Sequence, residues 1–166
     1  MGLKDPFTPT AEVQRLILDE LGSKIVANGE FQGDFWIQLE AHHLRNVVEF
    51  LRGHEALRFD SFVDLCGVDY LPRKPRFEVV THLYSLEKKH RIRIRCLVHD
   101  GPLTVPSLTT YWKAADWQER EAYDNYGILF EGHPRLARIL SAPGVTHHAQ
   151  RKDFPLKGER EETEDL

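Results

Sequence analysis

The sequence of 166 residues is poor in the thiols that redox centres need. Its two cysteines, Cys66 and Cys96, are too few and too far apart for an iron–sulfur cluster, which requires several thiolates at close spacing. Both lie in apolar runs that resemble strands, so we expect them to be buried and reduced, as in a cytosol-type compartment. A disulfide between them is the alternative.

Long hydrophobic runs are also missing. No stretch approaches the length of a transmembrane helix, and residues 1–10 have neither the basic start nor the apolar run of a signal peptide. If the protein works at a membrane, a partner is therefore expected to hold it there. The net charge of −4 argues against nucleic-acid binding, which normally uses a basic face.

Motifs for cofactors and covalent catalysis are absent too. There is no GxGxxG after a strand, no phosphate-binding loop and no nucleophile elbow. One enzymatic alternative is a metal or acid–base site built from His133, His147, His148 and Asp153, with Glu121. Their spacing matches no metal motif, and between Gly132 and Pro134 the histidine is expected to be a turn residue that bonds a carbonyl.

What is present indicates one globular domain, with 41% hydrophobic and 29% charged residues. Apolar spacing predicts one helix capped by Thr10 and ending at Gly22, and a second over Glu40–Arg52. Period-2 patterns predict five strands, at residues 24–31, 34–39, 59–70, 77–86 and 90–99. The expected fold is α+β, with two layers: two helices on a mostly antiparallel, five-stranded mixed sheet.

The last of these strands has a basic face. Arg91, Arg93 and Arg95 alternate with Ile92 and Ile94, so the arginines point to the side opposite the isoleucines. This face is either a solvated sheet surface or a dock for an acidic partner. Residues 100–113 then form an expected loop, with room for a short helical turn at residues 104–110.

A signature helix is expected over residues 117–126. Asp116 can cap it, with Glu119 reaching back in a capping box, and Gly127 can end it in the left-handed conformation. Arg120 and Asp124 are four residues apart on this helix and close enough to pair.

The C-terminal end has a different character. Pro155 disfavours helix at Phe154, so residues 151–158 are expected to be extended, with two apolar side chains that need another surface. The chain therefore divides into a mobile N-terminal tail at 1–9, a single domain at 10–140, an extended partner-binding tail at 141–158 and a disordered acidic tail at 159–166.

Several of these residues closely resemble the signature of the complex I 30-kDa subunit family, which is the C subunit of NADH-quinone oxidoreductase. The motifs are Glu119-Arg120-Glu121, Asp124, Tyr126-Gly127, Gly132-His133-Pro134, Arg138-Ile139-Leu140 and Arg151-Lys152-Asp153-Phe154-Pro155-Leu156. Upstream, Gly67-Val68-Asp69-Tyr70 and Arg76-Phe77-Glu78-Val79-Val80 are also similar. Asn125, Ala137 and residues 146–150 depart from the family pattern.

The resemblance implies a non-redox, peripheral-arm subunit of respiratory NADH:quinone oxidoreductase. Such a chain would have no active site or cofactor of its own, with FMN and iron–sulfur clusters on partner subunits. It would brace the large quinone-site subunit (the D subunit) and the neighbouring iron–sulfur subunit (the B subunit), on the cytoplasmic side of the bacterial inner membrane. The alternative within the wider family is the equivalent subunit of a membrane-bound hydrogenase or a photosynthetic-type quinone reductase.

The resemblance also implies which residues matter. Assembly is assigned to Glu119, Arg120, Glu121, Asp124, Gly132, His133, Pro134 and Arg138, and partner binding to Arg151, Lys152, Asp153, Phe154, Pro155 and Leu156. Replacing Arg120 or Asp153 is expected to weaken assembly and to spare the isolated fold.

Overall fold

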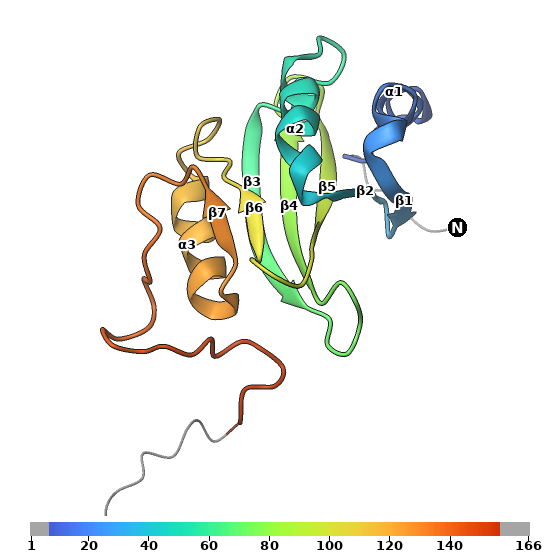
Figure 1. The fold of residues 1–166 in the computed structure, drawn as a ribbon. Helices are drawn as coiled ribbons and strands as arrows, with labels where there is room; N and C mark the ends of the chain where they lie inside the picture. The colour runs from blue at the N-terminus through green and yellow to red at the C-terminus, as the bar shows by residue number, and fades with distance from the viewer. Residues whose placement is uncertain (1–6, 157–166) are drawn as a thin grey trace, which may run out of the picture.

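The computed structural model describes residues 7–156 and contains three α-helices and seven strands within them (Figure 1). The helices are α1 (Ala11–Leu21), α2 (Leu44–Gly53) and α3 (Ala115–Tyr126), with short 3-10 turns at Gly22–Lys24 and Ala41–His43. The strands are β1 (Ile25–Phe31), β2 (Asp34–Glu40), β3 (Ser61–Asp69), β4 (Phe77–Ser85), β5 (His90–Val98), β6 (Thr104–Pro106) and β7 (Leu129–Glu131). The acidic tail predicted at 159–166 lies outside the described residues.

The main sheet has the strand order β1-β2-β5-β4-β3. Three of its pairings are antiparallel, and the central β2–β5 pairing is parallel. The parallel pairing arises because the chain leaves β2 through α2 and returns beside it only with β5, after β3 and β4. The predicted mixed, mostly antiparallel α+β sheet is confirmed, with each of the five strands close to its predicted range.

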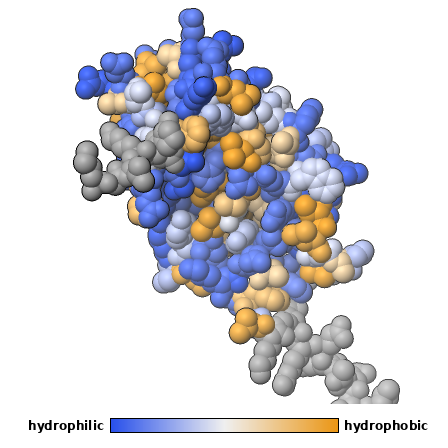
Figure 2. All heavy atoms as spheres, turned by 180° about the vertical axis from the view of Figure 1, so that it is seen from behind, coloured by the Kyte–Doolittle hydropathy of each residue, from blue (hydrophilic) through white to orange (hydrophobic). Residues whose placement is uncertain are grey.

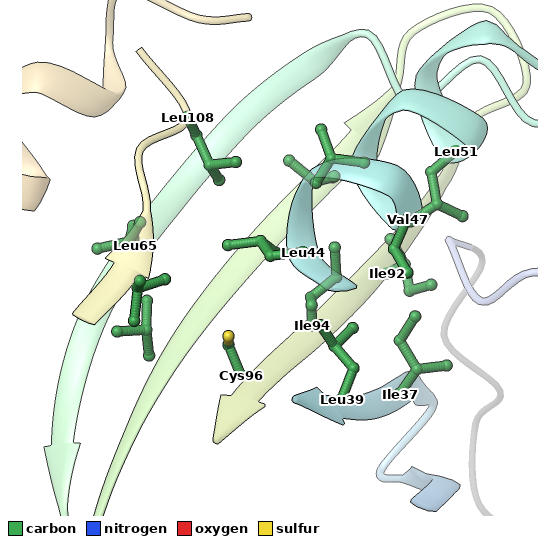
Figure 3. Close-up of a cluster of buried hydrophobic side chains, with 14 of the residues drawn as sticks. Ile37, Leu39, Leu44, Val47, Leu51, Leu65, Ile92, Ile94, Cys96 and Leu108 are labelled. Atoms are coloured by element: carbon green, nitrogen blue, oxygen red, sulfur yellow. The ribbon is translucent and has the colours of Figure 1, made fainter. Parts of the chain in front are cut away.

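The hydrophobic core lies between α2 and one face of this sheet (Figure 3). Helix α2 buries four side chains, Leu44, Val47, Val48 and Leu51. Facing them are the strand residues that alternate inward, including Ile37, Leu39, Ile92, Ile94 and Cys96. This alternation places the arginines of β5 on the opposite face, as the sequence predicts.

The start of the chain is tied to the same sheet. Thr10 caps α1 by accepting a hydrogen bond from the Val13 N–H at 3.4 Å, as predicted. Ahead of this cap, Phe7 O accepts a hydrogen bond from Arg91 N at 2.8 Å, and the Thr8 hydroxyl donates to Gly33 O. Residues 7–9, which the sequence assigns to the N-terminal tail, are thus hydrogen-bonded to the domain.

The loop predicted at residues 100–113 contains both a short strand and, at residues 108–112, a helical turn in which Trp112 N donates to Leu108 O at 3.0 Å. The strand belongs to a second, two-stranded parallel sheet. In it, β6 pairs with β7, so that Val105 lies opposite Phe130, and both side chains are buried. Strands of three residues are too short to show an alternating pattern, so the sequence does not reveal them. This small sheet brings the chain before α3 beside the chain after it.

The two cysteines face opposite sides of the main sheet. Cys96 is buried in the core, and burial raises the pKa of its thiol, whereas Cys66 is exposed. The expectation of burial is therefore right for Cys96 and wrong for Cys66, because Leu65 takes the inward position of β3 and turns its neighbour outward. Both are free thiols.

Candidate functional site: the signature helix and the C-terminal segment

Helix α3 lies along β3, one of the two edge strands of the main sheet (Figure 1). The Gln118 side-chain carbonyl accepts a hydrogen bond from Leu65 N, as a neighbouring strand would. Further along the helix the Tyr126 ring packs over Gly67, where a Cβ would lie 2.5 Å from the ring. The helix therefore covers the edge strand, and only glycine allows it to approach so closely.

The helix begins earlier than predicted and has a different start. Its N-cap is Ala114, without a side-chain hydrogen bond, and Asp116 lies inside the first turn. The preceding turn satisfies the first N–H groups, since Ala115 N donates to Trp112 O at 3.1 Å. The predicted capping box is therefore wrong. The predicted end is confirmed, because Gly127 adopts a φ of 75° and closes the helix.

Glu119 uses its carboxylate to bind the loop after β6. It accepts hydrogen bonds from Leu108 N at 2.6 Å and from the Ser107 hydroxyl at 2.7 Å. The side chain is fully buried, and this burial raises the pKa of Glu119 to about 7, although both hydrogen bonds oppose the rise. Glu119 thus fastens α3 to residues 107–109.

Asp124 fastens α3 to the C-terminal segment, which we define as residues 132–156. One carboxylate oxygen accepts hydrogen bonds from the backbone N–H groups of Ile139, Leu140 and Ser141, at 2.8 to 2.9 Å. The other accepts from the Ser141 hydroxyl at 2.6 Å. Burial alone would raise the pKa of Asp124, but these hydrogen bonds outweigh it and hold the pKa well below its usual range.

Arg138 extends the same network. Its guanidinium donates to Asp124 at 2.8 Å, to His147 O at 2.9 Å and to Thr146 O at 3.1 Å. Arg138 therefore connects Asp124 on the helix with Thr146 and His147, which lie further along the segment. Because the Asp124 side chain is completely buried, this pair is shielded from solvent.

The predicted pair between Arg120 and Asp124 is wrong. Arg120 instead donates to Ala137 O at 3.0 Å, and its guanidinium lies 5.3 Å from the centre of the Trp117 ring. Asp124 is occupied by Arg138, which approaches from outside the helix. Since Arg120 is itself buried, we expect its substitution to act on the fold as well as on assembly.

The Gly132-His133-Pro134 turn has an internal role. His133 Nδ1 accepts a hydrogen bond from Arg135 N at 3.0 Å, and its Nε2 donates to Asp116 O at 3.2 Å. The expectation of a turn histidine that bonds a carbonyl is confirmed. Gly132 has a φ of 83°, and Pro134 is exposed.

The partner-binding residues also contact their own domain. Arg151 donates twice to Tyr126 O, at 2.9 and 2.7 Å, and Lys152 N donates to Asp69 at 2.8 Å. Asp153 accepts two hydrogen bonds from Arg76. Phe154 stacks on His147, with ring centres 4.6 Å apart.

The last described residues, Pro155 and Leu156, are exposed. The predicted extended conformation is wrong for residues 151–154, which form a turn with Phe154 N donating to Arg151 O at 2.9 Å. The segment is thus bound to the domain as far as Phe154 and projects beyond it.

Asp69 and Arg76 belong to the same hydrogen-bond network, although the sequence did not single them out as site residues. Hydrogen bonds from Arg76, Lys152 N and Leu71 N overcome the effect of burial and lower the pKa of Asp69 to about 2. Both residues lie in motifs that carry the family resemblance. A charged residue beside a predicted core strand is a signal that could have marked them.

The histidines proposed as metal ligands have separate partners. His148 Nδ1 donates to Asp124 O at 2.9 Å, whereas the neighbouring His147 ring stacks on Phe154. Burial lowers the pKa of His148, and Glu121 is exposed beside β3. Across residues 7–156, no group of three or more His, Cys, Asp or Glu side chains is placed to hold a metal ion.

The basic face of β5 is paired with acids of its own sheet. Arg91 and Arg93 both form ion pairs with Asp34, and Arg95 pairs with Glu78. The arginines are therefore neither a fully solvated face nor an unpaired basic patch.

In the described part of the chain, no helix is both long and apolar enough to span a bilayer.

Together, the fold and this site define a structural domain whose signature polar side chains fasten a C-terminal segment. Residues 37–160 match the family described as the 30 Kd subunit of respiratory-chain NADH dehydrogenase. The chain belongs to this family.

Relatives match most of the chain. The second C subunit (C 2) of NADH-quinone oxidoreductase from Rhizobium meliloti (strain 1021) is 45% identical over 142 residues, which cover 86% of this chain and 78% of that protein. The C subunit of NADH-quinone oxidoreductase from Roseiflexus castenholzii (strain DSM 13941 / HLO8) is 42% identical over 159 residues, which cover 96% of this chain and 88% of that protein.

Solved structures share the fold. The trypsin-resistant fragment (1–134) of Nqo5 matches with a TM-score of 0.62 and 30% identity, covering 74% of this chain and 98% of that one. A chain of the membrane-bound sulfane sulfur reductase, an archaeal respiratory membrane complex, matches with a TM-score of 0.73 and 21% identity. The match covers 87% of this chain and 85% of that one. The second likeness concerns the fold alone.

Proposed function

We propose that this chain is a non-redox subunit of an NADH:quinone oxidoreductase of the complex I type. As a family member it has other complex I subunits as partners. Its specific role is to brace the large quinone-site subunit and the neighbouring iron–sulfur subunit in the peripheral arm. The complex moves electrons from NADH to quinone and couples this transfer to proton translocation.

The observation that carries the proposal is the use of the signature side chains as internal fasteners. Glu119, Asp124 and Arg138 direct their hydrogen bonds to the loop after β6 and to the C-terminal segment. These contacts hold the segment before any partner binds. Less conformational entropy is then lost on assembly than for a free tail.

The chemistry of the complex is assigned to other chains. FMN and the iron–sulfur clusters are on partner subunits, and this chain holds no cofactor. The complex keeps it at the cytoplasmic side of the bacterial inner membrane, where it is peripheral. The equivalent subunit of a membrane-bound hydrogenase or a photosynthetic-type quinone reductase is the less favoured alternative, since the relatives named above are NADH-quinone oxidoreductase subunits.

Affinity purification tests the proposal. The chain is tagged in its native host and isolated from gently solubilised membranes, and the co-purifying proteins are identified while NADH:quinone activity is assayed. We expect NADH-binding, iron–sulfur and membrane subunits, together with activity. Recovery with hydrogenase subunits would select the alternative, and recovery of the chain alone would contradict both.

A further inference from the structure

The sheet face turned away from α2 carries a surface hollow of about 510 Å³. Figure 2 shows the molecule from this side, where hydrophobic patches lie among hydrophilic ones. Its lining includes four large apolar side chains and two arginines, namely Phe31, Trp36, Val68, Val80, Arg93 and Arg95. We call it the sheet hollow.

The apolar part of the sheet hollow is unusual for a solvated face. An outward sheet face in a two-layer domain is normally polar, yet Phe31 is 63% exposed here. Beside it, Trp36, Val68 and Val80 add further apolar surface. Aromatic residues and arginine are the types enriched where proteins bind one another.

Arg95 is held in a fixed orientation in this hollow. Its Nε and Nη2 donate to Glu78 at 2.9 and 3.2 Å, and the guanidinium lies 5.0 Å from the centre of the Trp36 ring. Glu78 is fully buried, so an approaching molecule meets the arginine and not the carboxylate. Because the side chain is already ordered, little rotamer freedom is lost when a ligand binds it.

Arg93 is held in the same way and presents the same group. Its Nε donates to His82 Nε2 at 2.9 Å and its Nη2 donates to Asp34 at 2.7 Å. Within residues 7–156, the Nη1 groups of both Arg93 and Arg95 make no hydrogen bond, and no carboxylate lines the hollow. The hollow therefore offers two oriented donors beside apolar surface.

We propose that the sheet hollow binds a segment of another subunit of the complex, one in which an apolar side chain lies next to an aspartate or glutamate. The apolar side chain packs on Trp36 and Val80, and the carboxylate accepts from Arg93 and Arg95. A second copy of this chain fits poorly, because a symmetric pair would set these arginines against themselves. The proposal rests on the proposed function, since another subunit must be present.

Site-specific cross-linking in the purified complex tests this inference. Phe31 is replaced by the photo-cross-linker p-benzoylphenylalanine in the tagged chain, and the same change at Leu86 is the control. Leu86 is 66% exposed, close to the 63% of Phe31, but does not line the hollow. We expect position 31 to cross-link to a peptide of another subunit that contains an aspartate or glutamate, and position 86 not to reach that peptide.

Three outcomes would overturn it while the complex stays intact: a cross-link to a second copy, a cross-link to residues 157–166 of the same chain, or no cross-link at all. Failure of the proposed function looks different, because complex subunits would then not co-purify even with the unmodified chain.

A substitution gives an independent readout. Phe31→Ser is expected to weaken association with the complex about tenfold, since a partly exposed aromatic anchor is lost. Leu86→Ser is expected to leave association unchanged, and both variants should melt like the unmodified chain. Equal recovery of the two variants in the complex would contradict the inference.

Discussion

Arg76 donates two hydrogen bonds to Asp153, 77 positions further along the chain, at 2.9 and 2.6 Å. The same guanidinium binds Asp69 at the end of β3, at 2.9 and 2.7 Å. One arginine thus joins the sheet to the C-terminal segment. The two carboxylates differ in environment, since the Asp69 side chain is 2% exposed and that of Asp153 is 54% exposed.

This difference predicts unequal consequences for two matched substitutions. Asp69→Asn removes a buried charge partner and is expected to lower the free energy of unfolding by about 3 kcal/mol. Asp153→Asn breaks an exposed contact and is expected to lower it by at most about 1 kcal/mol. Urea denaturation of the isolated chain measures both.

The Asp153→Asn variant also tests the bracing role. Asp153→Asn is expected to reduce recovery of the chain in the complex, because the end of the segment loses its ion pair with Arg76 and is held less firmly. If this variant assembled normally and the complex lost only its turnover, the bracing role would be wrong.

Asp124→Asn is expected to be the most damaging conservative change on α3. Asparagine has one acceptor oxygen, so its NH₂ group must face either the N–H groups of Ile139, Leu140 and Ser141 or the guanidinium of Arg138. The half-buried guanidinium of Arg138 would also lose its charged partner, so we expect a loss of about 3 to 5 kcal/mol in urea denaturation. Glu121→Gln, at an exposed site on the same helix, is the control and should stay within about 0.5 kcal/mol. Similar losses in the two variants would argue against the anchoring role of Asp124.

Glu119 predicts a pH dependence of stability. Burial raises its pKa from the ordinary 4.5 to about 7, so the folded chain binds this proton more tightly than the unfolded chain does. The resulting stabilisation is complete below about pH 4.5 and is lost as the pH rises through 7. Relative to Glu119→Gln, the free energy of unfolding is expected to fall by about 3 kcal/mol between pH 4.5 and pH 8.

Glutamine serves as the reference because it resembles the protonated acid and can donate to Ser107. Burial lowers the pKa of His82, His90 and His148, so their titration has the opposite sign over part of this range. The contribution of these histidines cancels when the unmodified chain is compared with Glu119→Gln, because both chains contain them. A difference between the two proteins that did not vary with pH would contradict the assignment.

Gly127 predicts a steric effect beyond backbone strain. A Cβ at this position would lie 2.6 Å from both Arg151 Nη2 and His148 Nε2, whereas one at Gly144 would meet nothing. Both glycines have positive φ, at 75° and 92°. Gly127→Ala is therefore expected to destabilise the chain by about 1 kcal/mol more than Gly144→Ala in urea denaturation, because it also displaces the segment. Equal effects would mean that strain alone matters at Gly127.

Patterns in the sequence were enough to predict the α+β class, the five main strands, the first two helices and the family. These follow from local periodicity and from motifs such as the glycine that ends α3. The opposite orientation of isoleucines and arginines on β5 could also be predicted from the sequence, since side chains alternate along any strand and no tertiary information is needed.

Which charged groups meet could be learned only from the folded structure. Spacing along a helix suggested Arg120 as the partner of Asp124, but Arg138 takes that place from a separate segment. The same holds for Glu119, expected in a capping box and found on Ser107 and Leu108, and for Cys66, turned outward by the register of β3. Contacts between segments far apart in sequence depend on how the chain packs, and local patterns do not carry that information.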